Sequence, residues 1–282
     1  MTVQRLGIVG SGIMGSGIAE VAAKAGVEVV LRSRQQASAD AMVAGLEKSL
    51  AKQVDKGRLD ETVAKEVQGR VSASSELDAL ADCDLVLESV VEELDVKRSL
   101  FKDLDLVVKA GAILATNTST LPVVELAVAT GRPELVCGVH FFNPAPAMAL
   151  VEVIRPITAS DDTIATARAF AEACGKTAVE VKDRAGFIVN ALLFPYLNNA
   201  VRMLEQGTAS RDDIDAAMKG GCNFPMGPLA LLDLVGLDTS LAILDALYAE
   251  FRDPNYAAVP TLRRMVTAGQ LGRKTKSGFF SY

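Results

Sequence analysis

The feature that most constrains the fold of this chain is a glycine-rich segment near its start, Gly10-Ser11-Gly12-Ile13-Met14-Gly15. It follows an apolar run at residues 4–9 and precedes a stretch of helical character at 16–24. In such a strand–turn–helix, the glycines permit a tight turn, the approach of backbone to a pyrophosphate, and close packing of the helix. The unpaired N–H groups at the start of the helix attract the anion. A purely structural turn is the alternative. We predict that a dinucleotide contacts Gly10, Gly12, Ile13, Met14 and Gly15.

The first part of the chain alternates short apolar runs with stretches of helical length. Such alternation is typical of parallel strands joined by helices, and it predicts a doubly wound α/β domain of the Rossmann type. Two further strands are expected after it, with a helix between them at 161–173. The predicted strands are residues 4–9, 27–31, 84–90, 112–116, 135–142, 150–154 and 177–182.

The pattern changes after Asp183, where a polar segment ending in glycine separates two halves. From Phe187 onward, apolar residues recur with a helical period and are interrupted by Gly, Pro and Asp. Because 282 residues is long for a single core, we expect two domains: residues 1–183 to bind the dinucleotide, and an all-helical 184–282 to bind substrate and form a homodimer. The helical stretches are 188–204, 214–218, 229–247 and 262–266.

Composition excludes several classes of protein. A formal net charge of −6 lacks the basic field expected of a nucleic-acid-binding protein. No apolar run approaches the ~20 residues that span a bilayer, and the first residues do not resemble a signal peptide. The four cysteines are scattered, without a Cys-x-x-Cys pair, so we expect buried free thiols. A cytoplasmic protein without nucleic-acid or membrane partners is therefore expected.

The end of the second predicted strand indicates which dinucleotide binds. A site for NAD usually has an acidic residue there, about 20 residues after the glycines, which accepts hydrogen bonds from the ribose 2′-OH. This chain has Arg32, Ser33 and Arg34 instead. Two guanidinium groups suit a 2′-phosphate, which a carboxylate would repel. We favour NADP(H) as the cofactor; the alternative is that both arginines are solvated and NAD binds.

The position of the single histidine, His140, favours catalysis. It follows an apolar run at the carboxyl edge of the predicted sheet, where ligands bind in open α/β folds. Glu152 lies in an apolar strand, where an unpaired carboxylate would cost several kcal/mol. If the two strands pair around the turn at 143–148, Glu152 reaches His140 and stabilises its imidazolium form. Such a histidine moves a proton to or from oxygen as hydride moves to carbon. A structural histidine is the alternative, and one imidazole makes a metal site unexpected.

Six motifs, in order along essentially the whole chain, resemble those of the 3-hydroxyacyl-CoA dehydrogenases, most closely the short bacterial 3-hydroxybutyryl-CoA dehydrogenases. They are GSGIMGSGIAEVAAKAG, ATNTSTL, GVHFFNPAPAMALVEVI, DRAGFIVNALLFPYLNNAV, PMGPLALLDLVGLD and GQLGRKTKSGFFSY. By position, the resemblance implies that His140 is the catalytic histidine, that Glu152 pairs with it, and that the Ser119 hydroxyl bonds the substrate's 3-oxygen. It also implies that Asn143 supports the site and that Asn190 helps to hold the acyl group. From the residues alone, Ser119 could instead cap a helix at 121–127, and Asn190 could be a buried amide.

The resemblance implies further ligand contacts. Lys52 and Lys56, four residues apart on one predicted helix face, match lysines beside the CoA nucleotide, although a solvated face is the commoner outcome for such a helix. Two departures from the family pattern stand out: Ser33 replaces its usual acidic residue, and Glu93 its commoner asparagine. The positions that match cofactor contacts of the family are Glu92, Lys97, Asn117 and Lys274.

Together these features favour reversible hydride transfer between NADP(H) or NAD(H) and C3 of a short-chain (S)-3-hydroxyacyl-CoA, such as 3-hydroxybutyryl-CoA, with acetoacetyl-CoA as the keto partner. Two alternatives remain at this stage: a sugar-acid dehydrogenase of the gulonate type, and a non-catalytic nucleotide-binding structural protein of the same fold. Lys52 and Lys56 speak against the first alternative. The second alternative is disfavoured by the intact set of Ser119, His140, Glu152 and Asn190. Acyl chain length, and a carrier protein in place of CoA, stay open.

Overall fold

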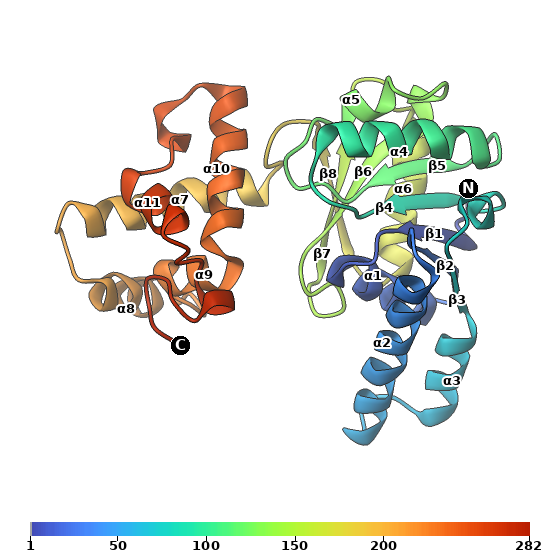
Figure 1. Cartoon of the computed structure of the whole chain (residues 1–282), viewed down its shortest axis with the longest axis horizontal. Coiled ribbons are helices and arrows are strands. Elements are labelled where there is room, and N and C mark those ends of the chain that lie inside the picture. The colour runs from blue at the N-terminus through green and yellow to red at the C-terminus, as the bar shows by residue number, and fades with distance from the viewer. Residues whose placement is uncertain (1) are drawn as a thin grey trace. The chain divides into compact units, whose positions relative to one another are not determined.

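The structure is a computed structural model that describes residues 2–282. The chain forms two compact units, one ending at Asp183 and the other running Arg184–Tyr282. Figure 1 colours the first unit from blue to yellow and the second from yellow to red. Within the described residues, no helix combines the length and apolar character that a membrane crossing requires.

The first unit is built on an eight-stranded sheet of order β3-β2-β1-β4-β5-β6-β7-β8. Neighbouring strands are parallel except for β6 and β7, which are antiparallel. This sheet and its covering helices confirm the predicted doubly wound α/β fold. The strands are β1 (Arg5–Val9), β2 (Glu28–Arg32), β3 (Val71–Ser74), β4 (Leu85–Glu88), β5 (Ile113–Thr116), β6 (Val136–Phe141), β7 (Leu150–Arg155) and β8 (Thr177–Lys182).

Several helices of the first unit share a core with the sheet, to which three of them contribute Ile18, Leu46 and Phe170. On α4, Phe101 and Leu104 are also buried. Two helices, α2 and α3, form an arm that extends away from the sheet (Figure 1). The helices are α1 (Ile13–Lys24), α2 (Gln36–Asp55), α3 (Glu61–Gly69), α4 (Leu94–Val107), α5 (Val123–Ala127) and α6 (Asp161–Ala173), with 3₁₀ turns η1 (Leu77–Leu80) and η2 (Pro133–Leu135).

One strand, β3, has no counterpart among the sequence predictions. It lies at the edge of the sheet, beside β2, and its residues alternate with serine as Val71-Ser72-Ala73-Ser74. Because an edge strand is paired on one side only and is partly exposed, it does not need the continuous apolar run that marks a buried parallel strand. The structure therefore adds this strand to those expected.

The second unit is helical, as predicted, and has its own core, which includes Phe194, Leu229 and Leu244. The apolar stretch at 229–247 forms two helices, because Gly236 has a φ of 102°, a conformation that favours glycine. The elements are α7 (Val189–Glu205), α8 (Arg211–Cys222), α9 (Pro228–Val235), α10 (Leu237–Phe251) and α11 (Pro260–Thr267), with 3₁₀ turns η3 (Pro254–Tyr256) and η4 (Arg273–Thr275).

The cysteines are free, but not all are buried as expected. Cys83 and Cys137 are buried, Cys174 is partly buried, and Cys222 at the end of α8 is exposed. Burial raises the pKa of Cys83 to about 11 and that of Cys137 to about 12. At neutral pH both are therefore thiols that pack as small apolar groups.

Candidate active site

The glycine-rich loop connects β1 to α1 in a conformation that depends on its glycines. Gly10 has a φ of 131°, and a Cβ there would lie 2.2 Å from the carbonyl oxygen of Ser89. A Cβ on Gly15 would lie 2.5 Å from the carbonyl oxygen of Gly10. At Gly12 a Cβ would meet nothing within 4 Å, and no side chain caps the start of α1 there. The first turn of α1 thus presents open backbone N–H groups suited to a pyrophosphate.

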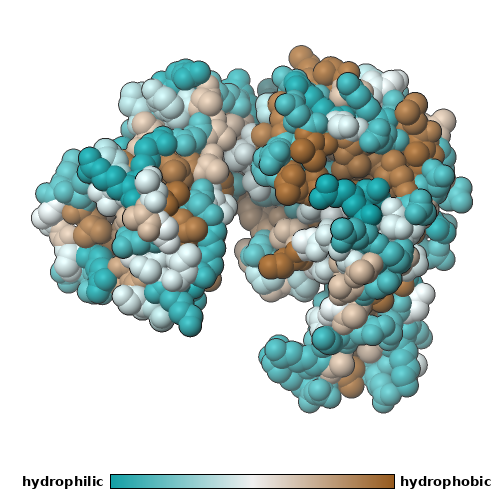
Figure 2. Space-filling view, in the orientation of Figure 1, coloured by the Kyte–Doolittle hydropathy of each residue, from teal (hydrophilic) through white to brown (hydrophobic). Residues whose placement is uncertain are grey.

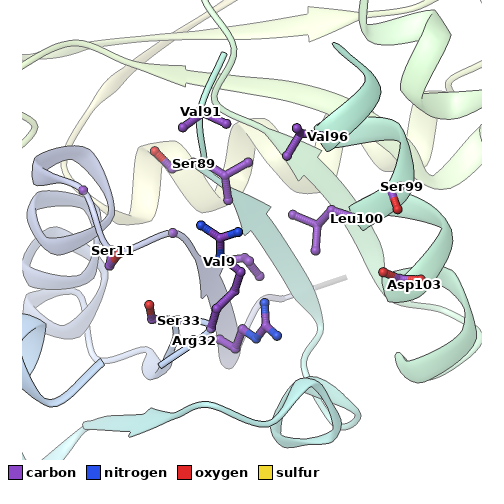
Figure 3. A pocket seen from close by; sticks show the side chains of 14 residues that line it. Val9, Ser11, Arg32, Ser33, Ser89, Val91, Val96, Ser99, Leu100 and Asp103 are labelled. Atoms are coloured by element: carbon purple, nitrogen blue, oxygen red, sulfur yellow. The ribbon is translucent and has the colours of Figure 1, made fainter. Parts of the chain in front are cut away.

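A cavity of about 740 Å³ opens beside this loop. Figure 3 shows Arg32 and Ser33 of the β2 end on one side of it, and Val96 and Leu100 of α4 on another. The apolar wall from α4 suits a flat aromatic ring, and the serine and glycine backbone around Ser11 suits polar groups. In size and lining, the cavity fits the adenosine and phosphate part of a dinucleotide.

At the end of β2, the chain is fixed by backbone contacts, so that its side chains border the cavity. The Ser33 N–H donates to the Ser74 carbonyl oxygen at 3.1 Å, and Arg32 Nε donates to the Ser75 carbonyl oxygen at 3.3 Å. Ser33 is buried and Arg34 is exposed. An acidic lining residue, Asp103, comes from α4 and not from the end of β2.

The β6–β7 hairpin brings His140 and Glu152 together in direct cross-strand register. Glu152 Oε2 lies 2.8 Å from His140 Nδ1, and Ser119 Oγ lies 3.0 Å from His140 Nε2. The side chains of His140 and Glu152 are almost completely buried. Because an ionised carboxylate only accepts hydrogen bonds, Nδ1 carries a proton in this pair. Nε2 is then the ring nitrogen that faces Ser119.

Ser119 lies in the loop after β5 and is held by its backbone. Its N–H donates to Glu92 Oε1 at 2.9 Å, and the hydroxyl of Thr118 donates to the same carboxylate. The first N–H groups of α5 bond to Asp183, at 3.0 Å from Val123 and 2.8 Å from Val124. In this structure Asp183 therefore caps α5, and the Ser119 hydroxyl is left for His140.

Lys97 and Asn117, expected beside the cofactor, have well-defined partners next to this loop. Lys97 is 1 % exposed, and its Nζ lies 2.5 Å from Glu88 Oε1 and 3.2 Å from Glu92 Oε2. Asn117 Oδ1 accepts the Phe141 N–H at 2.8 Å and so ties the end of β5 to β6. The sequence predictions missed Glu88, although an acid inside the apolar run 84–90 is the same signal that singled out Glu152.

The remaining predicted site residues belong to other elements of the chain. Lys52 is in the last turn of α2 and Lys56 caps that helix, both exposed on the arm. Asn143 is exposed in the β6–β7 connection. In the second unit, Asn190 is buried in the first turn of α7, and Lys274 Nζ pairs with Asp238 at 2.5 Å. Residues 2–282 contain no group of three or more His, Cys, Asp or Glu side chains arranged to hold a metal ion.

A Rossmann domain whose parallel strands lead to a glycine loop and a histidine–carboxylate pair is the architecture of a dinucleotide-dependent oxidoreductase. Comparison with known families agrees. Residues 5–184 match the NAD-binding domain of 3-hydroxyacyl-CoA dehydrogenase, and residues 186–282 match the C-terminal domain of the same enzyme. The chain belongs to the 3-hydroxyacyl-CoA dehydrogenase family.

Individual relatives match along the full length. A 3-hydroxybutyryl-CoA dehydrogenase from Clostridioides difficile is 47 % identical over 278 residues, which cover 99 % of both chains. Among solved structures, FadB2 of Mycobacterium tuberculosis matches with a TM-score of 0.97 at 45 % identity. The match covers 100 % of this chain and 100 % of that one. The (S)-3-hydroxybutyryl-CoA dehydrogenase PaaH1 from Ralstonia eutropha has a TM-score of 0.97 at 42 % identity, covering 100 % of this chain and 99 % of that one.

Proposed function

We propose that the protein is a cytoplasmic dehydrogenase that interconverts (S)-3-hydroxybutyryl-CoA and acetoacetyl-CoA, with NADP(H) as its preferred cofactor. The observation that carries this proposal is the buried His140, held between Ser119 Oγ and Glu152 Oε2 at the carboxyl end of β6. The names of the relatives support the substrate class. The glycine loop at Gly10 and Gly12 and the end of β2 would hold a nicotinamide dinucleotide, which when bound would supply the hydride to C3 or accept it.

In the direction of reduction, His140 Nε2 donates a proton to the 3-oxygen as C3 gains the hydride. The product is the 3-hydroxyl group, and the neutral imidazole regains its proton from solvent. The Ser119 hydroxyl, 3.0 Å from Nε2, donates a hydrogen bond to the same oxygen and stabilises the charge that develops on it. Glu152 keeps the proton on Nδ1 and stabilises the imidazolium form before transfer. In oxidation these steps run in reverse.

The cofactor preference rests on the end of β2. Arg32 and Arg34 bring two permanent positive charges to the border of the cavity, and Ser33 occupies the position where a carboxylate would repel a phosphate. We assign these three residues to the 2′-phosphate of NADP(H). Because cells usually keep their NADP(H) largely in the reduced form, this preference makes reduction of acetoacetyl-CoA the favoured direction in the cell.

The substrate is assigned to two regions of the chain. Lys52 and Lys56 are exposed at the end of the arm, whose surface is largely hydrophilic (Figure 2), and as compact ammonium groups they suit the phosphates of CoA. Asn190 and Asn143 are assigned to support the acyl group. A homodimer formed through the second unit is part of the proposal, supported by large apolar side chains exposed there, including Leu192 at 71 % and Leu234 at 49 %.

The experiment that tests this function measures initial rates of acetoacetyl-CoA reduction with NADPH and with NADH. We expect turnover with both, and a higher kcat/KM with NADPH. Absence of turnover with either cofactor would contradict the substrate assignment. A strong preference for NADH would contradict only the role given to Arg32, Ser33 and Arg34.

A further inference from the structure

We propose that Glu88 is a positioning residue for this reaction: from the end of β4, its buried carboxylate sets the place of the Ser119 hydroxyl relative to His140. The inference rests on the proposed function, because it concerns the geometry of the same catalytic group. Glu88 does not itself line the cavity, and its hydrogen bonds lead to Ser119 only through other side chains, along two branches.

The Glu88 carboxylate is fully buried, and both of its oxygens are satisfied. Oε1 accepts the Val90 N–H at 2.6 Å and lies 2.5 Å from Lys97 Nζ, while Oε2 accepts the Thr116 hydroxyl at 2.7 Å. A carboxylate out of water requires such partners. Since these partners come from β5, α4 and the loop after β4, the carboxylate ties three segments together at one end of the sheet.

The first branch runs through Thr116, the last residue of β5. Its Oγ1 donates to Glu88 and also accepts the Thr118 N–H at 3.2 Å. Between them, the Asn117 N–H donates to the Glu88 carbonyl oxygen at 2.8 Å. The backbone that leads from β5 to Ser119 is therefore bonded to Glu88 at consecutive residues.

The second branch runs through Lys97 and reaches Ser119 itself. Lys97 Nζ bridges Glu88 and Glu92, at 2.5 Å and 3.2 Å. The Glu92 carboxylate then accepts the Thr118 hydroxyl and the Ser119 N–H. Lys97 thus adds a buried cation to the two donors that orient the exposed Glu92 carboxylate. Both branches converge on residues 117–119, and Ser119 Oγ makes the 3.0 Å contact with His140 Nε2.

A buried ion pair is weak evidence for a contribution to stability, because apolar replacements are often at least as stable. The pair of Glu88 and Lys97 matters here because it fixes geometry. Strand pairing alone fixes β4 and β5 but not the loop that follows them. Misplacement of a reacting group by about 1 Å can cost roughly 10²-fold in rate. The pair of Glu88 and Lys97 holds that loop, and so the serine hydroxyl, in the geometry that the proton transfer needs.

The single histidine offers a test that needs no substrate. In protein labelled with ¹⁵N-histidine, the imidazole signals come from His140 alone. Ser119→Ala gives the signal that results when the Ser119–His140 hydrogen bond is lost. Glu88→Gln turns the acceptor that faces Thr116 into an amide donor, and Thr116→Val removes the bridging hydroxyl. We expect both to shift the His140 signal toward that of Ser119→Ala, and the matched control Thr116→Ser to keep the wild-type signal.

Glu88→Gln leaves Lys97 without its buried anion and could fail to fold. Two further variants keep the test decisive in that case. Thr116→Val leaves both charges in place, and the double variant Glu88→Gln/Lys97→Met removes both while preserving volume. If the pair were merely structural, the folded double variant would keep the wild-type His140 signal, and that result would overturn the inference. A shift toward the Ser119→Ala signal would support it.

Kinetics separates this inference from the proposed function. In Glu88→Gln, and in Thr116→Val, which leaves Lys97 in place, we expect kcat for acetoacetyl-CoA reduction to fall by about tenfold or more. KM for acetoacetyl-CoA should stay within about twofold, because no group that touches substrate is removed. Wild-type kcat in these variants would contradict the positioning role. If the wild-type protein showed no turnover, the proposed function would be contradicted. The ¹⁵N signal of His140 would then test the inference by itself.

Discussion

Glu152 faces His140 directly across the β6–β7 hairpin, and its Oε2 lies 2.8 Å from His140 Nδ1. The two side chains pair between adjacent strands, so the rigid sheet sets their geometry. A carboxylate in this place fixes which ring nitrogen carries the proton, and it leaves Nε2 facing Ser119 at 3.0 Å.

Glu152→Gln should lower kcat for acetoacetyl-CoA reduction by about 10²-fold or more, since the amide no longer stabilises the imidazolium that donates the proton. Binding of the cofactor should not change, and NADPH fluorescence measures it. The matched control is Glu180→Gln on the neighbouring strand β8, where Glu180 pairs with Arg155. That variant should keep the wild-type kcat. Equal activities of Glu152→Gln and Glu180→Gln would show that the pair with His140 does not serve catalysis.

Ser33→Asp should lower kcat/KM with NADPH by roughly tenfold or more, because a carboxylate at this buried position opposes the charge of the 2′-phosphate. The kcat/KM with NADH should fall less, or rise, because the new carboxylate can accept hydrogen bonds from the ribose. Ser72→Asp on β3, exposed and outside the cavity lining, adds the same charge as a control. If the ratio of kcat/KM with NADPH to kcat/KM with NADH did not change in Ser33→Asp, the assignment of NADP(H) to this site would lose its basis.

Replacing Lys52 and Lys56 together by glutamate should raise KM for acetoacetyl-CoA by roughly tenfold, equivalent to about 1.4 kcal/mol. The kcat should stay near the wild-type value, because in the proposed function the end of α2 holds the CoA phosphates and not the reacting carbon. The increase should shrink as salt is added. Lys65→Glu, on the other helix of the arm, controls for a change in overall charge. If KM for acetoacetyl-CoA in the double variant equalled the wild-type value, a substrate without CoA would be favoured.

The sequence was sufficient to predict the glycine loop, most strands and the pairing of Glu152 with His140, for physical reasons that the structure makes plain. The turn between β6 and β7 is short enough to force neighbouring strands to pair, and a carboxylate in a buried strand needs a partner, which gave Glu152. The same reasoning applies to Glu88, but its cation, Lys97, lies on a helix where the sequence looks solvated. Its burial depends on how α4 packs against the sheet. The edge strand β3 was missed because half of its residues are polar.

Glu20 offers a test of how the arm is joined to the sheet domain. It is buried on α1 and accepts hydrogen bonds from Lys24 at 2.6 Å, Ser49 at 2.7 Å and Gln53 at 2.8 Å. Burial opposes ionisation, but the hydrogen bonds from Lys24, Gln53 and Ser49 outweigh it and hold the pKa of Glu20 below its usual 4.5.

A lowered pKa in the folded state stabilises the fold above the unfolded-state value, and this contribution disappears as the pH falls through the folded-state pKa. Glu20→Gln should therefore lower the free energy of unfolding by about 1–3 kcal/mol at pH 7. The difference from wild type should shrink as the pH falls below 4.5. Urea unfolding at several pH values, with the exposed Glu28→Gln as control, measures it. A difference that does not vary with pH would show that Glu20 is not ionised in the fold.

The most direct test of the account is the kcat of His140→Ala with acetoacetyl-CoA and NADPH, compared with wild type at the same saturation. We expect a decrease of about 10²- to 10⁴-fold, the usual contribution of a positioned acid–base group, with NADPH still bound. A His140→Ala enzyme that reduces acetoacetyl-CoA within a few fold of the wild-type rate would contradict the assignment of proton transfer to this side chain.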